Sequence, residues 1–135
     1  MATNIFVNLP VRNLEASKTF FGALGFAFNA QFTDETAAAM VIDENIFAML
    51  LTHEKFAQFT PKTIADAHTS SEVLIALSRD SKDAVIALFD KAIAAGATQA
   101  RPGDDYGFMM SRAFSDLDGH IWEIMWMDPS FVQPG

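Results

Sequence analysis

The order of the predicted elements repeats along the chain, and this repeat constrains the fold more than any single motif does. Apolar runs, turn residues and helical spacings give the order strand–helix–strand–strand–strand in residues 3–53. Residues 72–127 give the same order again, although the two stretches share little residue identity. A repeat of this kind predicts two copies of one supersecondary unit. We therefore predict an α+β fold built from two βαβββ half-repeats.

Capping residues and glycines mark the ends of both predicted helices. Asn13 is placed to cap the first helix, and Gly25 ends it. In the second half, Asp80 or Ser81 can cap a helix that ends at Gly96. These local signals predict where each helix begins and ends, and therefore where the chain passes from a strand into a helix and back into a strand.

The predicted strands cover most of the remaining sequence. Their ranges are 5–11, 26–32, 36–42, 46–52, 72–78, 98–101, 107–115 and 120–127. Turn-forming residues separate several of them, at 43–45, 102–105 and 116–119. The connection 54–71 has no strand pattern, so we expect a crossover with room for a short helix, and a lid over a site is the alternative.

Length and composition exclude several classes of protein. The chain has 135 residues, half of them apolar, which fits a single domain spanning 1–135 with its own core. No apolar run approaches the roughly 18 residues of a membrane helix, and the first residues do not resemble a signal peptide. We therefore expect no membrane partner and, by default, a cytoplasmic location.

Cysteine content and charge narrow the chemistry further. The absence of cysteine excludes disulfides, thiolate metal sites and a cysteine nucleophile. A net charge of −8 repels phosphate backbones, so we expect no nucleic-acid partner.

Two motifs stand near the ends of the chain. Residues 9–14, Leu-Pro-Val-Arg-Asn-Leu, and the aromatic and Leu-Gly-Phe positions within 20–26 form the first, and residues 114–124, which contain Asp-Leu-Asp-Gly-His-Ile-Trp-Glu, form the second. They resemble the opening pattern and the closing hairpin of the vicinal-oxygen-chelate superfamily, which includes glyoxalases, bleomycin-resistance proteins and extradiol dioxygenases. The resemblance covers essentially the whole chain and is greatest to glyoxalase-related proteins. It implies curled mixed sheets around a cavity and, commonly, a homodimer.

The resemblance also indicates where a metal ion would bind. In metal-dependent members, His, Gln or Glu side chains from inner strands hold a divalent ion. Carried over one by one, the four ligand positions fall on Phe6, Leu50, Leu74 and Glu123. Only Glu123 can bind a metal, so we expect no metal site and no other cofactor.

Strand alternation predicts which side chains face the cavity. We expect Leu50 and Thr52 of the fourth strand and Leu74 of the fifth strand to face it, because the opposite sets are more uniformly apolar. A registration shifted by two residues would instead bring Asn8, Thr52 and Glu72 toward ligand positions and form a weak metal site.

Several polar residues are candidates for contacts with a ligand. Glu123 lies in an apolar run, so it is a general base or ligand acceptor, or else it pairs with Arg112 or is exposed at the mouth of the cavity. Arg112 could itself hold a carboxylate or phosphate, or pair with an acidic neighbour. Tyr106 could line the cavity, and the polar side chains of Asn8 and Thr52 either face it or satisfy nearby backbone groups.

The three histidines match no zinc motif, and the chain has no phosphate-binding glycine loop and no serine-nucleophile elbow. Among them, His68 could reach a site only if its segment folded over one.

Two functional hypotheses follow. The first is a metal-independent small-molecule-binding protein of the bleomycin-resistance type, with a cavity walled by Phe6, Leu50 and Leu74 and with Glu123 and Arg112 as polar anchors. The alternative is a glyoxalase-related lyase or isomerase that uses an atypical metal set or uses Glu123 as a base. An extradiol dioxygenase ranks third, because iron needs histidines that this site lacks. One scaffold hosts all these activities, so fold alone does not decide between them.

Overall fold

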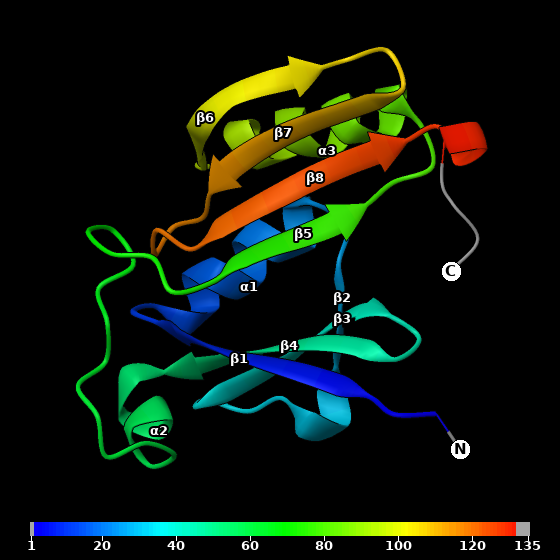
Figure 1. Cartoon of the computed structure of the whole chain (residues 1–135). Helices are drawn as coiled ribbons and strands as arrows, with labels where there is room; N and C mark the ends of the chain where they lie inside the picture. Colours follow the sequence, from blue (N-terminus) through cyan, green and yellow to red (C-terminus); the bar gives the residue numbers. More distant parts are fainter. Residues whose placement is uncertain (1, 132–135) are drawn as a thin grey trace. The chain divides into compact units, whose positions relative to one another are not determined.

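The computed structural model describes residues 2–131, and the chain divides into two compact units, Met1–Asp66 (unit 1) and Ala67–Gly135 (unit 2). Each unit holds one four-stranded mixed sheet and the helices that pack on it (Figure 1). The element order confirms the two predicted βαβββ half-repeats. Among residues 2–131, no helix has the length and apolar character needed to cross a membrane.

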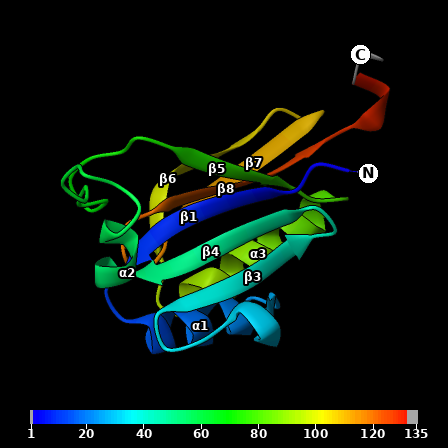
Figure 2. The same ribbon diagram turned by 90° about the horizontal axis from the view of Figure 1, so that it is seen from below.

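Unit 1 contains a sheet with the spatial order β1-β4-β3-β2, of which β1, β4 and β3 are seen side by side in Figure 2. Strands β1 and β4 are parallel, and the other neighbours are antiparallel. Helix α1 packs on the sheet through Leu14, Phe20 and Phe21, and Asn13 caps it as predicted. The elements are β1 (Ile5–Val11), α1 (Leu14–Ala23), β2 (Ala27–Asn29), η1 (Ala30–Phe32), β3 (Ala37–Asp43), β4 (Ile46–Thr52) and α2 (His53–Ala57).

Unit 2 repeats this arrangement with the strand order β5-β8-β7-β6, and helix α3 lies behind the sheet in Figure 1. Strands β5 and β8 are parallel, whereas β7 is antiparallel to both of its neighbours. Ser81 caps α3, and Gly96 follows it with a φ of +119°. The elements are β5 (Leu74–Ser78), α3 (Lys82–Ala94), β6 (Thr98–Asp105), β7 (Met109–Ser115), β8 (Ile121–Met127) and η2 (Pro129–Phe131).

Two strand predictions were wrong in their extent. The predicted strand 26–32 is a short β2 followed by η1. The predicted turn 102–105 is the second half of β6, and the chain turns instead at residues 106–108, where Gly107 has a φ of +84°. Register shifts in β6 on both sides of Arg101 let an edge strand accommodate Pro102 and Gly103.

One face of the unit 2 sheet is buried under α3. Trp122 and Ile124 of β8 and Phe114 of β7 are almost inaccessible to solvent, and α3 contacts both strands. Because side chains alternate along a strand, the residues between these positions lie on the opposite face. We call that opposite face the open face of unit 2; Leu74 on β5, which belongs to it, is 57% exposed.

The carboxylate of Asp116 holds the hairpin between β7 and β8. Its Oδ1 accepts hydrogen bonds from the backbone N–H groups of Asp118 and His120, and its Oδ2 accepts one from the indole Nε1 of Trp122 at 3.0 Å. Asp116 is only 7% exposed, and burial raises the pKa of its carboxyl group. One buried side chain therefore ties the turn of the hairpin to a core tryptophan.

Replacing Asp116 by Ala should lower the free energy of unfolding by about 3 kcal/mol, because three donors would lose their acceptor and at least one is buried. Urea denaturation followed by tryptophan fluorescence measures the loss. Asp128→Ala is the matched control: its carboxylate accepts from the backbone and hydroxyl of Ser130 near the end of the described chain, and the change should be small. Equal losses in both variants would contradict the role given to Asp116.

Candidate functional site

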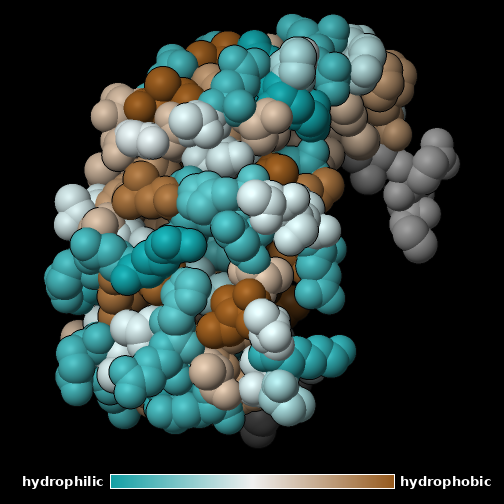
Figure 3. All heavy atoms as spheres, turned by 90° about the vertical axis from the view of Figure 1, so that its left-hand side faces the viewer, coloured by the Kyte–Doolittle hydropathy of each residue, from teal (hydrophilic) through white to brown (hydrophobic). Residues whose placement is uncertain are grey.

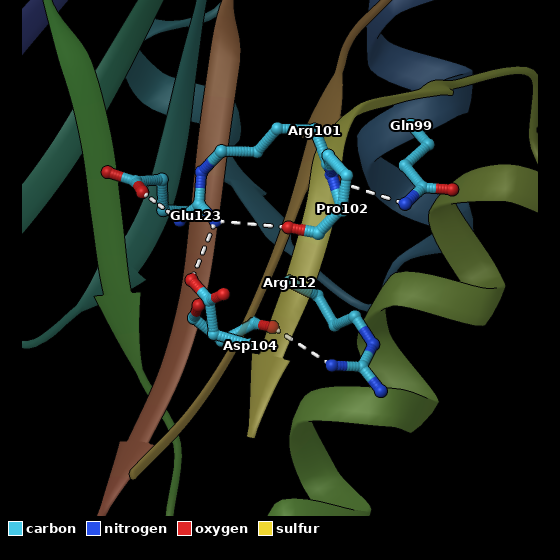
Figure 4. A network of polar contacts seen from close by, with 7 residues as sticks. Gln99, Arg101, Pro102, Asp104, Arg112 and Glu123 are labelled. Carbon is cyan, nitrogen blue, oxygen red and sulfur yellow. Dashed lines mark hydrogen bonds and ion pairs between the residues drawn. The ribbon is translucent and has the colours of Figure 1, made fainter. Parts of the chain in front are cut away.

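A row of four side chains crosses the open face of unit 2. Strand register aligns Ala76 of β5, Glu123 of β8, Ala113 of β7 and Arg101 of β6. The small Ala113 leaves room for the long Arg101 side chain to cross above it, and the guanidinium Nη2 donates to Oε2 of Glu123 at 2.6 Å (Figure 4). Glu123 is therefore held by an arginine that lies two strands away.

Further contacts fix the guanidinium of Arg101. Its Nη1 donates to Oδ2 of Asp104 at 3.2 Å and to the backbone oxygen of Pro102 at 3.2 Å. The hydrogen bond to the Glu123 carboxylate is the main cause that raises the pKa of Arg101. The side chain of Glu123 is 24% exposed and that of Arg101 is 39% exposed, so a small molecule can reach the pair.

Apolar side chains flank this ion pair on the same face. Ile121 and Met125 lie two residues to either side of Glu123 along β8, and Leu74 is the register partner of Ile121. Leu74 and Glu123 therefore share one face of the sheet, and the contact of either residue with a ligand stays a prediction. The face offers a charged hydrogen-bonding pair within an apolar surround.

Arg112 lies apart from the ion pair, and the alternative in which Glu123 pairs with Arg112 is wrong, because Arg101 pairs with that carboxylate. The role of Arg112 as a ligand contact stays a prediction. Arg112 is the register partner of Ile124 and so lies on the face that α3 covers, pointing away from Glu123 in Figure 4. Its guanidinium donates to the backbone oxygen of Ser111. It also packs so tightly over Gly103 that a Cβ there would overlap it.

In unit 1, the two predicted residues of β1 share one face, and their contact with a ligand stays a prediction, whereas the facing predicted for β4 is wrong. Phe6 and Asn8 lie on the face opposite α1, and Phe6 stacks on Phe47 with ring centroids 5.0 Å apart. Leu50 instead pairs in register with Leu9 on the buried face and is fully buried. Both faces of β4 are apolar, so uniform hydrophobicity could not identify the buried one.

Thr52 is a further correction, because it has a local structural role. It is the register partner of Val11 on the buried face, and its hydroxyl accepts a hydrogen bond from the backbone N–H of Lys55 at the start of α2. Asn8 aligns with Met49 on the other face. The alternative registration, which needs Asn8 and Thr52 to point the same way, is therefore wrong.

Tyr106 lies in the turn between β6 and β7, apart from the ion pair. It is 60% exposed, and its ring lies against that of Phe108 with centroids 6.4 Å apart. No contact joins it to Glu123 among the interactions described for residues 2–131. Its proposed contact with a ligand stays a prediction.

The side chains at the expected ligand positions do not fit a divalent ion. Phe6 and Leu74 offer only carbon atoms, and the β4 residues on the face opposite α1 include Met49 and Leu51. The single carboxylate, Glu123, is already bound by Arg101. Within residues 2–131, no group of three or more His, Cys, Asp or Glu side chains is arranged to hold a metal. Hard and borderline ions need several N or O donors.

Comparisons with known proteins agree with this fold. A family model described as bleomycin resistance protein-like N-terminal matches residues 3–43. A solved structure of a hypothetical protein from S. aureus is 26% identical, with a TM-score of 0.78 over 93% of this chain and 95% of that chain. None of the curated proteins compared with the chain matches it.

Two further solved structures are similar over nearly their whole length. A glyoxalase/bleomycin resistance protein/dioxygenase family enzyme from Burkholderia phytofirmans PsJN is 21% identical, with a TM-score of 0.76 over 93% of this chain and 99% of that chain. A glyoxalase-related enzyme from Fulvimarina pelagi is 21% identical, with a TM-score of 0.78 over 93% of this chain and 88% of that chain. At this identity, the likeness is one of fold.

A double-mutant cycle should detect the ion pair. Glu123→Gln, Arg101→Met and the double variant should give a coupling free energy of about 1 kcal/mol in urea denaturation, because the pair is partly exposed and partly screened. The coupling should shrink in roughly 1 M NaCl, where the Debye length is short. Additive effects of the two single substitutions at low salt would show that the side chains do not interact.

Proposed function

We propose that this chain, a member of the vicinal-oxygen-chelate superfamily by its fold and its bleomycin-resistance-like N-terminal region, is a metal-independent small-molecule-binding protein. The observation that carries the proposal is the Arg101–Glu123 ion pair. A guanidinium occupies the one carboxylate to which the superfamily resemblance gives a metal-binding role. The pair then acts as a hydrogen-bonding anchor for a ligand.

The surroundings of the pair indicate what such a ligand would look like. Leu74, Ile121 and Met125 supply apolar surface on the same sheet face, and an unbranched methionine can adapt to irregular shapes. Glu123 and Asp104 place two carboxylates against one guanidinium, so the cluster carries a net negative charge. These features favour a largely apolar molecule with a hydrogen-bond donor over an anion.

Unit 1 offers a second surface of related chemistry. The stacked rings of Phe6 and Phe47 form an aromatic platform, and Phe6 is 53% exposed. Asn8 lies next to Phe6 on the same face of β1 and can donate and accept hydrogen bonds. This surface suits an aromatic group of a ligand.

The alternative function is a glyoxalase-related lyase or isomerase in which Glu123 moves a proton. It is favoured by the description of two similar structures as enzymes and by the carboxylate on an accessible face. Against it, Arg101 competes for the same carboxylate. The homodimer and the cytoplasmic location that the sequence predicts stay predictions.

Divalent ions should not stabilise the protein. After chelator treatment and dialysis, adding about 1 mM Mg²⁺, Mn²⁺, Ni²⁺ or Zn²⁺ should change Tm by no more than about 1 °C, since an ion that binds only the folded state would raise it much further. A saturable rise of several degrees, with one ion per chain by elemental analysis, would overturn the metal-independent proposal. Glu123→Gln serves as the control for an ion held by that carboxylate.

Ligands found by a thermal-shift screen should depend on the ion pair. Glu123→Gln and Arg101→Met should each weaken binding about tenfold or more, because each removes a charge-assisted hydrogen bond. Glu72→Gln, an exposed carboxylate just before β5, is the matched control and should bind normally. If a ligand binds Glu123→Gln normally but its turnover stops, the enzyme alternative holds. Unchanged binding in both ion-pair variants would place the ligand elsewhere.

A further inference from the structure

Unit 2 contains a hollow of about 510 Å³ at one end of its sheet. Three segments line it: residues 67–71, which precede β5; residues 96–98, between α3 and β6; and residues 115–121, at the hairpin from β7 to β8. A volume of this size lies within the roughly 300–1,000 Å³ typical of small-molecule sites. None of the lining residues is Arg101, Asp104 or Glu123, although Ile121 belongs both to this lining and to the apolar surface beside the ion pair.

Close packing of residues 67–71, which we call the strap, against the hairpin gives the hollow a defined wall. A Cβ on Gly119 would lie only 2.7 Å from the backbone nitrogen of His68 and 2.8 Å from the carbonyl atoms of Ala67. Only a glycine permits this approach, and Gly119 also has a φ of +91°. The strap therefore rests directly on the hairpin backbone.

Hydrogen bonds also fix the part of the lining that the hairpin contributes. Asp116 lines the hollow, but its oxygens already accept from the backbone of Asp118 and His120 and from the Trp122 indole. The Asp116 carboxylate therefore stabilises the hairpin, and the hydroxyl groups of Ser71, Thr98 and Ser115 are the lining groups on which recognition of a ligand depends.

The lining is rich in hydroxyl groups and poor in charge. Thr69, Ser70 and Ser71 come from the strap, and Thr98 and Ser115 come from neighbouring ends of β6 and β7. Each hydroxyl can donate one hydrogen bond and accept two. The lining contains no lysine or arginine, and its ionisable side chains are His68 and Asp116, so a phosphate or carboxylate would meet a carboxylate as well as one imidazole. Figure 3, which views the side where the connection between α2 and β5 runs, shows mainly hydrophilic residues.

Two apolar side chains complete the lining. Leu117 and Ile121 present carbon surface beside the hydroxyl groups. A molecule that carries hydroxyls on a hydrocarbon ring matches both kinds of surface. We propose that this hollow is a binding site for a neutral polyhydroxylated molecule about the size of a monosaccharide. The proposal goes beyond the function assigned to the ion pair and does not depend on it.

The test is a titration of the ¹⁵N-labelled full chain by NMR with D-glucose, D-ribose and glycerol as neutral probes and sodium phosphate as the anionic comparison. At least one neutral probe should give saturable shifts of the amides of residues 67–71, 96–98 and 115–119, with a Kd of about millimolar order for an open, hydrated site. The absence of saturable shifts with all three neutral probes, or tighter binding of phosphate at these amides, would overturn the proposal.

Two variants test the residues themselves. The double substitution Thr98→Val and Ser115→Ala removes two lining hydroxyls and should weaken the bound probe about fivefold or more. Ser78→Ala, at the end of β5 outside the hollow, is the matched control and should bind like the natural chain. The amides of Arg101 and Asp104 should not shift with the probe, which separates this site from the ion-pair site. Unchanged affinity in the folded double variant would contradict the assignment.

Discussion

Each unit buries one face of its sheet under a helix, and this burial decides which side chains remain for function. In unit 2 the face under α3 takes Trp122, Ile124 and Phe114 out of water, and apolar burial of this kind is the main stabilising term for a small unit. Because side chains alternate along a strand, the residues between the buried ones lie on the other face. Glu123 lies between two buried residues of β8, so its place on the open face follows from the packing of its neighbours.

The ion pair on that face gives Glu123 a positively charged partner from the same chain. Glu123 stands where the superfamily resemblance gives a metal ligand, but Arg101 supplies the neighbouring positive charge from within the chain. A covalently attached cation is present at every pH at which the protein is folded and requires no uptake from solution. Its geometry is also set by the protein, through Asp104 and the Pro102 backbone. The partner of the Glu123 carboxylate is therefore a side chain of the edge strand β6.

Much of the fold could be predicted because its signals are local. Asn13 and Ser81 cap their helices as expected, and the glycine after Asp118 marks the hairpin between β7 and β8. The buried face of β4 could not be predicted, since Leu50 and Leu51 are equally apolar and the register with β1 decides between the faces. Arg101 was missed as a site residue because Pro102 and Gly103 look like a turn. The register shifts that keep them in an edge strand depend on pairing with β7.

The contact between Gly119 and the strap also indicates where the second half-repeat begins. The strand and helix pattern suggests a start near residue 72, whereas Ala67 and His68 already lie against the hairpin backbone with no space for a single added carbon. A fragment or chimaera that joins this half to another at residue 72 would lose the strap, in which Ala67 and His68 contact the hairpin turn. A chimaera of the two halves should therefore be joined before residue 67, at the boundary between the two compact units in the sequence.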